Sequence, residues 1–192
     1  MRNNPAEILD FWFGRSGETG YGEFRSEWFQ KDEAFDREVT DRFGGVYEEA
    51  TAGGLDGWRE EAGSCLALVI ALDQFPRNMF RGDARTHATD GKALHTAKHA
   101  IDHALDRELP AFQRMFLYMP FMHAEDVDDQ RRSVELFEGL AAEPGGPDVT
   151  EYAVGHRDIV ERFGRFPHRN ALLGRETTPE EAEFLTRPGS SF

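Results

Sequence analysis

Three short stretches of the chain combine proline with charged or polar side chains, and they hold the residues that could do chemistry. They are residues 73–78 (DQFPRN), 118–126 (YMPFMHAED) and 162–170 (RFGRFPHRN). The first and the third share a Phe-Pro pair followed by arginine and asparagine. Proline fixes the backbone at such a corner, so the side chains that follow are held in defined directions. Arginine presents a planar set of donors that matches a carboxylate or a phosphate.

These residue types favour the binding of a small anionic molecule. Arg77, Arg165 and Arg169 would hold its carboxylate or phosphate. The other predicted ligand-binding residues are Asn78, His168 and Asn170, whose side chains would orient it. Residues 156–175 carry five arginines against two acidic residues, in a chain whose net charge is −14. Such a basic stretch either neutralises the acidic residues 125–143 or faces an anionic ligand.

An enzyme of hydrolytic or proton-transfer type is the alternative. The predicted catalytic residues are His123, His156, Glu125 and Asp73. Either histidine could act as a general base, since a pKa near 6.5 suits proton transfer at neutral pH, and either carboxylate could orient it. Arginine would stabilise developing negative charge. No nucleophile or cofactor motif accompanies these residues, and we predict no cofactor and no metal.

Two further interpretations stay open at the level of the sequence. In the first, the charged residues form a structural network in which Arg77 and Arg169 pair with Asp73 and Asp126, and His156 only holds helices in register. In the second, the protein is an interaction scaffold for a protein partner, which would need an exposed concave groove lined by aromatic side chains.

Composition narrows the classes of function. The chain has 192 residues and a net charge of −14, which argues against nucleic acid or anionic lipid as a partner. The single cysteine excludes an intrachain disulfide and cysteine-based zinc sites. His95, His99 and His103 recur at helical spacing, and we interpret them as an exposed helix flank. The longest apolar run is far shorter than the roughly 20 residues of a membrane span, so we expect a cytoplasmic protein.

The elements that position these residues are helices. Capping residues, glycine stops and apolar residues at helical spacing predict helices over 5–13, 35–50, 66–75, 90–105, 110–120, 127–140, 149–163 and 179–185. Pro76 is expected to end the third of them, and Pro120 to kink or end the fifth. Because no stretch alternates between apolar and polar residues, we predict an all-α single domain over residues 1–192. Its seven or eight helices would pack in antiparallel pairs.

Helical spacing also predicts which side chains face the interior. For the helix over 90–105 they are Leu94, Ala97, Ile101 and Leu105. For the helix over 149–163 they are Tyr152, Ile159, Val160 and Phe163, and His156 lies on the same face. A histidine on a buried face needs partners for both ring nitrogens.

Most of the chain resembles the bacterial domain-of-unknown-function 924 family. The resemblance rests on residues 8–14, Trp28-Phe29, 66–78, 116–123, 162–170, Leu173-Gly174-Arg175 and 188–192. It implies an all-helical fold of the tetratricopeptide-like, right-handed superhelical kind. It implies no activity, cofactor or catalytic residue. The chain lacks the tetratricopeptide repeat signature, so the superhelix is expected from the resemblance alone.

Overall fold

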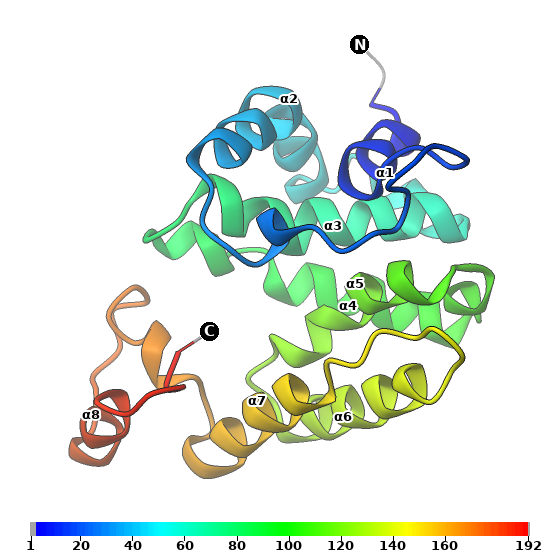
Figure 1. The fold of residues 1–192 in the computed structure, drawn as a ribbon. Helices are drawn as coiled ribbons and strands as arrows, with labels where there is room; N and C mark the ends of the chain where they lie inside the picture. The colour runs from blue at the N-terminus through cyan, green and yellow to red at the C-terminus, as the bar shows by residue number, and fades with distance from the viewer. Residues whose placement is uncertain (1–2, 192) are drawn as a thin grey trace.

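The computed structural model describes residues 3–191, and this part of the chain is built from helices (Figure 1). The α-helices are α1 (Pro5–Phe13), α2 (Glu33–Thr51), α3 (Ala62–Met79), α4 (Asp90–Asp102), α5 (Ala111–Met122), α6 (Val127–Ala141), α7 (Thr150–Phe163) and α8 (Pro179–Leu185). Short 3-10 helices interrupt the connections: η1 (Ser26–Trp28), η2 (Asp56–Glu60), η3 (Ala84–His87), η4 (Leu105–Glu108) and η5 (Pro167–Arg169). With eight α-helices and no strand in residues 3–191, the predicted all-α class is confirmed.

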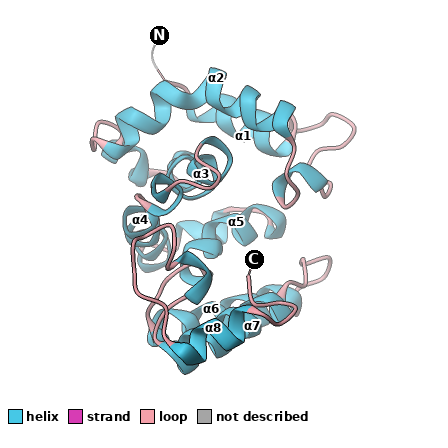
Figure 2. Cartoon of the chain, turned by 90° about the vertical axis from the view of Figure 1, so that its left-hand side faces the viewer, coloured by secondary structure: helices cyan, strands magenta, loops and turns pink. Residues whose placement is uncertain are grey.

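The helices stack in layers that follow the order of the chain. α2 packs on α3, α3 on α4, α5 on α6, and α6 on α7. Viewed from the side, α1 and α2 cover one face of α3, α4 and α5 lie beneath it, and α6, α7 and α8 form the far layer (Figure 2). The segment after α7 carries η5 and α8 and lies at one end of the stack (Figure 1). We call residues 164–191 the C-terminal arm.

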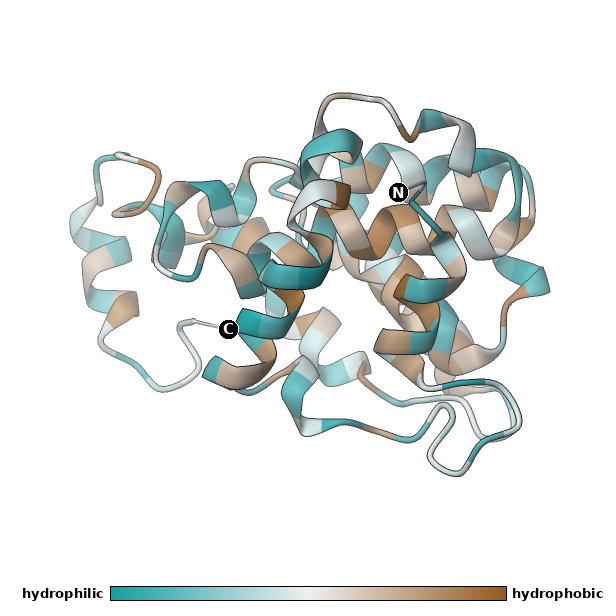
Figure 3. Ribbon diagram, turned by 90° about the horizontal axis from the view of Figure 1, so that it is seen from above, coloured by the Kyte–Doolittle hydropathy of each residue, from teal (hydrophilic) through white to brown (hydrophobic). Residues whose placement is uncertain are grey.

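The core is centred on α3, in which every residue from 65 to 76 is buried. Large aromatic side chains from other helices surround it, some edge-on and some stacked: the Trp12 and Phe116 rings are 5.7 Å apart at 89°, and the Phe43 and Phe75 rings are 4.9 Å apart at 18°. A second, smaller cluster of Ile159, Val160 and Phe166 joins the C-terminal arm to α7. Seen from above, hydrophobic residues concentrate where helices pack, and hydrophilic residues lie on outer turns and loops (Figure 3).

Helix ends follow the local capping signals. The side chain of Asn4 accepts a hydrogen bond from the backbone of Ala6 at the start of α1, and α1 ends at Gly14 with a φ of +82°. At α8, Thr178 and Glu181 form the predicted capping box. These signals are contained in three or four adjacent residues, which is why the sequence predicts these two helix ends correctly.

α3 continues through Pro76, so the expectation that this proline would end the helix was wrong. The helix runs on to Met79. Proline has no N–H to donate to the carbonyl four residues earlier, which is that of Leu72. The hydroxyl of Thr89, the residue before α4, donates to the Leu72 carbonyl at 2.5 Å. A neighbouring element therefore supplies the hydrogen bond that proline cannot make.

Replacing Thr89 by valine is expected to lower the free energy of unfolding by about 1–3 kcal/mol, because the buried Leu72 carbonyl would lose its donor. Urea denaturation measures the change. In a Pro76→Ala background the backbone N–H of residue 76 is restored, so Thr89→Val should cost less than half as much there. Equal costs in the two backgrounds would show that the hydroxyl does not replace the missing N–H.

The buried face of α4 differs from the predicted one. The helix ends at Asp102 rather than reaching Leu105, and Ala104 then takes a left-handed conformation with a φ of +56°. The buried residues of α4 are Ala93, Thr96, Ala97 and Ala100, whereas Leu94 and Ile101 are only partly buried. Small side chains allow a close approach to α3, where the Cys65 thiol lies 3.9 Å from the Thr96 carbonyl. Close packing, rather than the largest apolar residues, decides which face is inside.

Two other expectations need correction. Pro120 does not end α5, which continues to Met122. Tyr152 was expected to face inward, but it is 64% exposed. It lies in the first turn of α7, and helical spacing identifies a face without showing how far along the helix that face is covered.

Candidate functional site

Asp73 and His123 form the innermost contact of a polar cluster. Asp73 lies on α3 with no exposed surface, and His123 follows the last residue of α5. The Nδ1 atom of His123 is 2.8 Å from Oδ1 of Asp73. The other carboxylate oxygen accepts a hydrogen bond from Gln74 at 2.6 Å. An ionised Asp73 accepts a hydrogen bond from the Nδ1–H of His123, which leaves Nε2 as the ring nitrogen able to accept a proton.

Arg77 lies one helical turn after Asp73 on α3 and connects the helix to α4. Its Nη1 atom donates to the Asp73 backbone carbonyl at 2.5 Å and lies 3.3 Å from Oδ1 of the same residue. The same nitrogen donates to Oδ1 of Asp90 at 2.9 Å. Arg77 is therefore held by two carboxylates from two helices.

Asp90, the first residue of α4, joins the segments. Its Oδ2 atom lies 3.4 Å from Nη1 of Arg169 and 3.3 Å from Nδ1 of His87. Arg169 comes from η5 in the C-terminal arm, and it also donates to the backbone carbonyl of His123 at 3.0 Å. We call Asp73, Arg77, His87, Asp90, His123 and Arg169 the Asp90 cluster.

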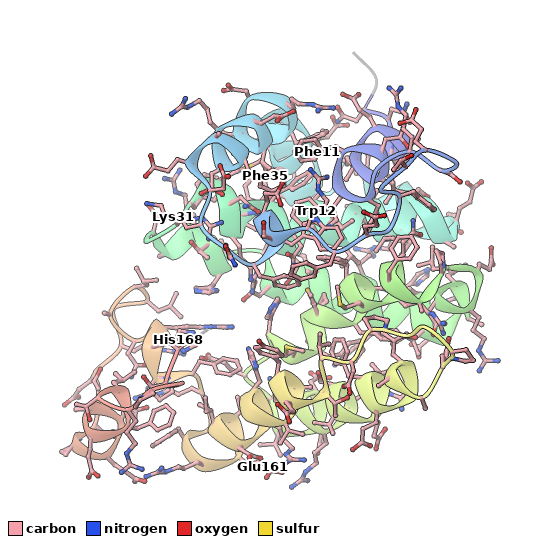
Figure 4. All side chains as sticks on the ribbon, in the orientation of Figure 1. Phe11, Trp12, Lys31, Phe35, Glu161 and His168 are labelled. Carbon is pink, nitrogen blue, oxygen red and sulfur yellow. The ribbon has the colours of Figure 1, made fainter. Side chains whose placement is uncertain are left out.

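Two more histidines border the Asp90 cluster. The ring of His156, on α7, is 6.4 Å from that of His123, and its Nδ1 atom is 2.7 Å from the Tyr152 carbonyl. The ring of His168 is 5.6 Å from that of Phe166. Figure 4 marks His168 on the C-terminal arm, which brings it toward the helical stack.

Burial keeps these histidines neutral at pH 7. Burial and then the charge of Arg77 lower the pKa of His123, despite the opposing effect of Asp73. Burial and then the neighbouring His123 lower the pKa of His156 to about 3. Burial and then Arg169 lower the pKa of His168 to about 4. A neutral imidazole can accept a proton, which is what a general base must do.

The carboxylates and guanidinium groups of the Asp90 cluster balance in charge. Burial alone would raise the pKa values of Asp73 and Asp90, but Arg77 and the neighbouring histidines together outweigh it, and both pKa values are lowered. Burial lowers the pKa of Arg169 to about 10, which still leaves it charged at pH 7. Two negative and two positive groups are thus enclosed together.

Some donors in the cluster have no acceptor. Nη2 of Arg77 and Nε of Arg169 are buried, and neither has a hydrogen-bond partner within residues 3–191. The Arg169 guanidinium also lies 4.3 Å above the Phe166 ring. In the described part of the chain, no group of three or more His, Cys, Asp or Glu side chains is arranged to hold a metal ion.

Three predicted ligand-binding residues make their hydrogen bonds outside the Asp90 cluster. Asn78 donates to Asp36 of α2 at 2.7 Å. Arg165 makes two hydrogen bonds to Glu181, at 2.7 and 2.9 Å. Asn170 also donates to Glu181, at 3.2 Å. The last two side chains hold η5 to α8, because a buried carboxylate there needs donors.

Glu125 does not orient a histidine, although the sequence allowed that role. One of its oxygens accepts the backbone N–H of Phe166 at 2.7 Å. Arg175 donates to both of its oxygens, at 2.6 and 2.9 Å. Glu125 therefore fastens the C-terminal arm to the end of α5. Asp126, considered as a partner for arginine, caps α6 instead.

Sequence reasoning missed Asp90, His87 and Arg175. An acidic residue in the first turn of a helix is expected for its favourable interaction with the helix dipole, so Asp90 gave no distinct signal. His87 lies in a connection with no apolar pattern of its own. Nothing in the local sequence distinguishes their contacts from those of exposed residues.

The fold and the Asp90 cluster define an all-helical, acidic protein with charged groups buried where α3, α4, α5 and η5 meet. Residues 8–189 match the family described as bacterial proteins of unknown function (DUF924), and the chain belongs to this family. The resemblance found in the sequence is thereby confirmed. None of the helices in residues 3–191 is long and apolar enough to cross a bilayer.

A solved structure has the same fold over nearly the full length of both chains. It is that of a protein of unknown function from Agrobacterium tumefaciens, with 46% sequence identity and a TM-score of 0.83. The match covers 94% of this chain and 96% of that chain. A search of curated proteins found no match.

Proposed function

We propose that the protein binds a small anionic molecule at the Asp90 cluster, through Arg77 and Arg169. The observation that carries the proposal is the pair of buried guanidinium nitrogens, Nη2 of Arg77 and Nε of Arg169, that find no acceptor among residues 3–191. A buried donor left unpaired costs about 1–3 kcal/mol, and more when the group is charged. Carboxylate or phosphate oxygens would accept from both arginines.

The charge of the cluster supports an anion of low charge. Asp73 and Asp90 offset the two arginines, and His123 is neutral. Because the cluster is close to neutral overall, it would hold a ligand with one negative charge through hydrogen bonds from the arginines rather than through a large positive charge. We place this binding in the cytoplasm, because a chain with a single cysteine needs no oxidising compartment to form disulfides.

Thermal unfolding in the presence of anions tests the proposal. Inorganic phosphate, acetate and succinate are compared with sodium chloride at matched ionic strength. A bound anion at 100 times its Kd should stabilise the protein by about 2.7 kcal/mol, which for a chain of this length is a rise in Tm of several degrees. A flat response to all three anions would contradict the proposal.

Variants test whether the anion binds at the Asp90 cluster or elsewhere on the protein. Arg169→Gln should remove the anion-dependent rise in Tm, whereas the exposed Arg132→Gln should retain it. Arg77→Lys keeps the charge but loses the planar set of donors, so it should weaken the response without requiring a buried charge to be deleted. An unchanged response in Arg169→Gln and Arg77→Lys would place the anion elsewhere.

Proton transfer is the second candidate, and the 2.8 Å contact between His123 and Asp73 favours it. In this arrangement Asp73 orients the ring and His123 takes a proton from water or from the bound molecule. Turnover of p-nitrophenyl phosphate or p-nitrophenyl acetate that disappears in His123→Asn, but not in the exposed His95→Asn, would distinguish catalysis from binding alone.

A further inference from the structure

An aromatic hollow lies on the face of the molecule between α5 and the segment that follows α1. It has a volume of about 280 Å³, close to the lower end of small-molecule sites. Its lining includes Phe24, Trp28, Phe29, Phe112 and Asp148. Figure 1 shows the contributing connections, blue after α1 and yellow before α7, above and below α5. The hollow shares none of its lining residues with the Asp90 cluster.

The walls of the hollow are aromatic rings anchored in the core. The rings of Trp28 and Phe29 meet at 89°, and Trp28 packs on Phe116 with centroids 4.8 Å apart. At Gly22 the φ is +71°, and a Cβ there would lie 2.8 Å from the Phe112 ring. Glycine at this position thus allows the loop to approach Phe112 closely and to hold the walls together.

Large aromatic surfaces remain uncovered at the edge of the hollow. Phe24 is 72% exposed and Phe29 is 52% exposed. Elsewhere on this protein, arginines lie over partly buried rings: Arg85 lies 4.3 Å above the Phe80 ring, and Arg162 lies 4.7 Å above the Phe163 ring. In such cation–π contacts the face of the ring attracts the positive charge.

The rings of the hollow have no such cation among residues 3–191. Arg25, in the same segment, turns away and donates to the Phe11 carbonyl at 2.7 Å. Lys31 pairs with Glu33 at 3.1 Å, and Figure 4 shows it at the far end of this segment. No lysine or arginine of the described residues therefore competes for the ring faces.

A carboxylate completes the hollow. Asp148 lies in its lining, and one of its oxygens accepts the backbone N–H of Thr150 at 3.1 Å. Within the described part of the chain it forms no ion pair with lysine or arginine. The hollow therefore combines ring faces, which attract cations, with a negative charge on a protein whose net charge is −14.

We infer that this aromatic hollow binds a small quaternary ammonium compound. The methylated nitrogen contacts the exposed rings of Phe24 and Phe29, which stack on each other with centroids 5.8 Å apart, and Asp148 supplies charge complementarity. A methylated ammonium group suits the hollow better than a primary ammonium group, because apolar rings cannot hydrogen-bond an N–H. This site is independent of the proposed anion site.

Titration with choline chloride and with its neutral isostere 3,3-dimethyl-1-butanol tests the inference. The two molecules have the same shape and differ in charge. Choline is expected to bind at least tenfold more tightly, and its methyl protons should shift upfield in the NMR spectrum because they lie over ring faces. Equal affinity for the alcohol would show an apolar hollow without cation recognition, which overturns the inference.

Variants assign the site. Phe24→Leu and Phe29→Leu keep an apolar side chain but remove a ring face, so each should weaken choline binding several-fold and reduce the upfield shift. Asp148→Asn should weaken choline binding without changing that of the alcohol. Tyr152→Leu, an exposed aromatic residue outside the lining, is the matched control. The inference would be overturned if choline did not bind at concentrations up to 50 mM. It would also be overturned if Phe24→Leu, Phe29→Leu and Asp148→Asn all left choline binding unchanged.

Discussion

Between pH 7 and pH 4 the free energy of unfolding is expected to fall steeply, and His156 is expected to be a major cause. Its pKa is about 3 in the folded protein, where it is buried beside His123, and near 6.5 in an unfolded chain. Below pH 6.5 the unfolded state therefore binds a proton that the folded state does not bind until about pH 3. Stability present above pH 6.5 is lost as the pH falls through this window, by about 1.4 kcal/mol per pH unit.

Neighbouring groups act in the same direction. The pKa of His168 is lowered to about 4, so it adds to the loss between pH 6.5 and pH 4. The lowered pKa of Asp73 adds a further loss at lower pH, because its carboxylate is protonated first in the unfolded chain. Together these groups can remove a large part of the 5–15 kcal/mol that typically separates folded from unfolded states.

Urea denaturation at pH 7, 6, 5 and 4 measures the effect. In His156→Phe the decline of the unfolding free energy should be shallower than in the unmodified protein, by about 1.4 kcal/mol per pH unit between pH 6 and pH 4. His103→Gln, a replacement of an exposed histidine, serves as the control. Parallel curves for the unmodified protein and His156→Phe would refute the assignment to His156.

Asp73→Asn is expected to lower the free energy of unfolding by about 3–5 kcal/mol, because it removes one partner of a buried ion pair. Arg77 would keep only Asp90 as a carboxylate partner, and the ring N–H of His123 would lose its charged acceptor. Asparagine has nearly the same volume as aspartate, so no cavity accounts for the change.

The matched control is Asp83→Asn, which removes an exposed carboxylate paired with Arg85 and should leave stability nearly unchanged. Urea denaturation at pH 7 compares the two variants. A loss below about 1 kcal/mol for Asp73→Asn would mean that Asp73 does not hold the Asp90 cluster together. The NMR chemical shifts of the His123 ring report separately whether its orientation survives.

Local signals explain what the sequence predicted well. The cap of α1, the capping box of α8 and the start of α6 after Asp126 each depend on a few adjacent residues. The path of α3 through Pro76 depends instead on Thr89, which lies outside the helix and meets it only in the folded protein. Helix boundaries set by such tertiary hydrogen bonds cannot be derived from the local sequence.

The candidate site likewise contains residues that the sequence indicated and contacts that only the folded structure shows. Residue type and position at helix ends indicated Asp73, Arg77, His123 and Arg169, and the structure brings these four together. The same reasoning also included Arg165 and Asn170, because the type of a polar residue does not identify its partner. Their common partner, Glu181, lies in α8. Their contacts therefore depend on how the C-terminal arm packs, which the local sequence does not show.

The contacts of Asp90 join segments that are far apart in the sequence, so they cannot all form at the same stage of synthesis. A chain emerges from the ribosome beginning with its N-terminus, so α3 and α4 are available to meet early. Arg169, the second guanidinium partner of Asp90, follows 79 residues later. A nascent chain that has already assembled its central helices still exposes a half-neutralised carboxylate until the arm docks. The Asp90 cluster can therefore be complete only after residue 169 has been synthesised, later than all its other members.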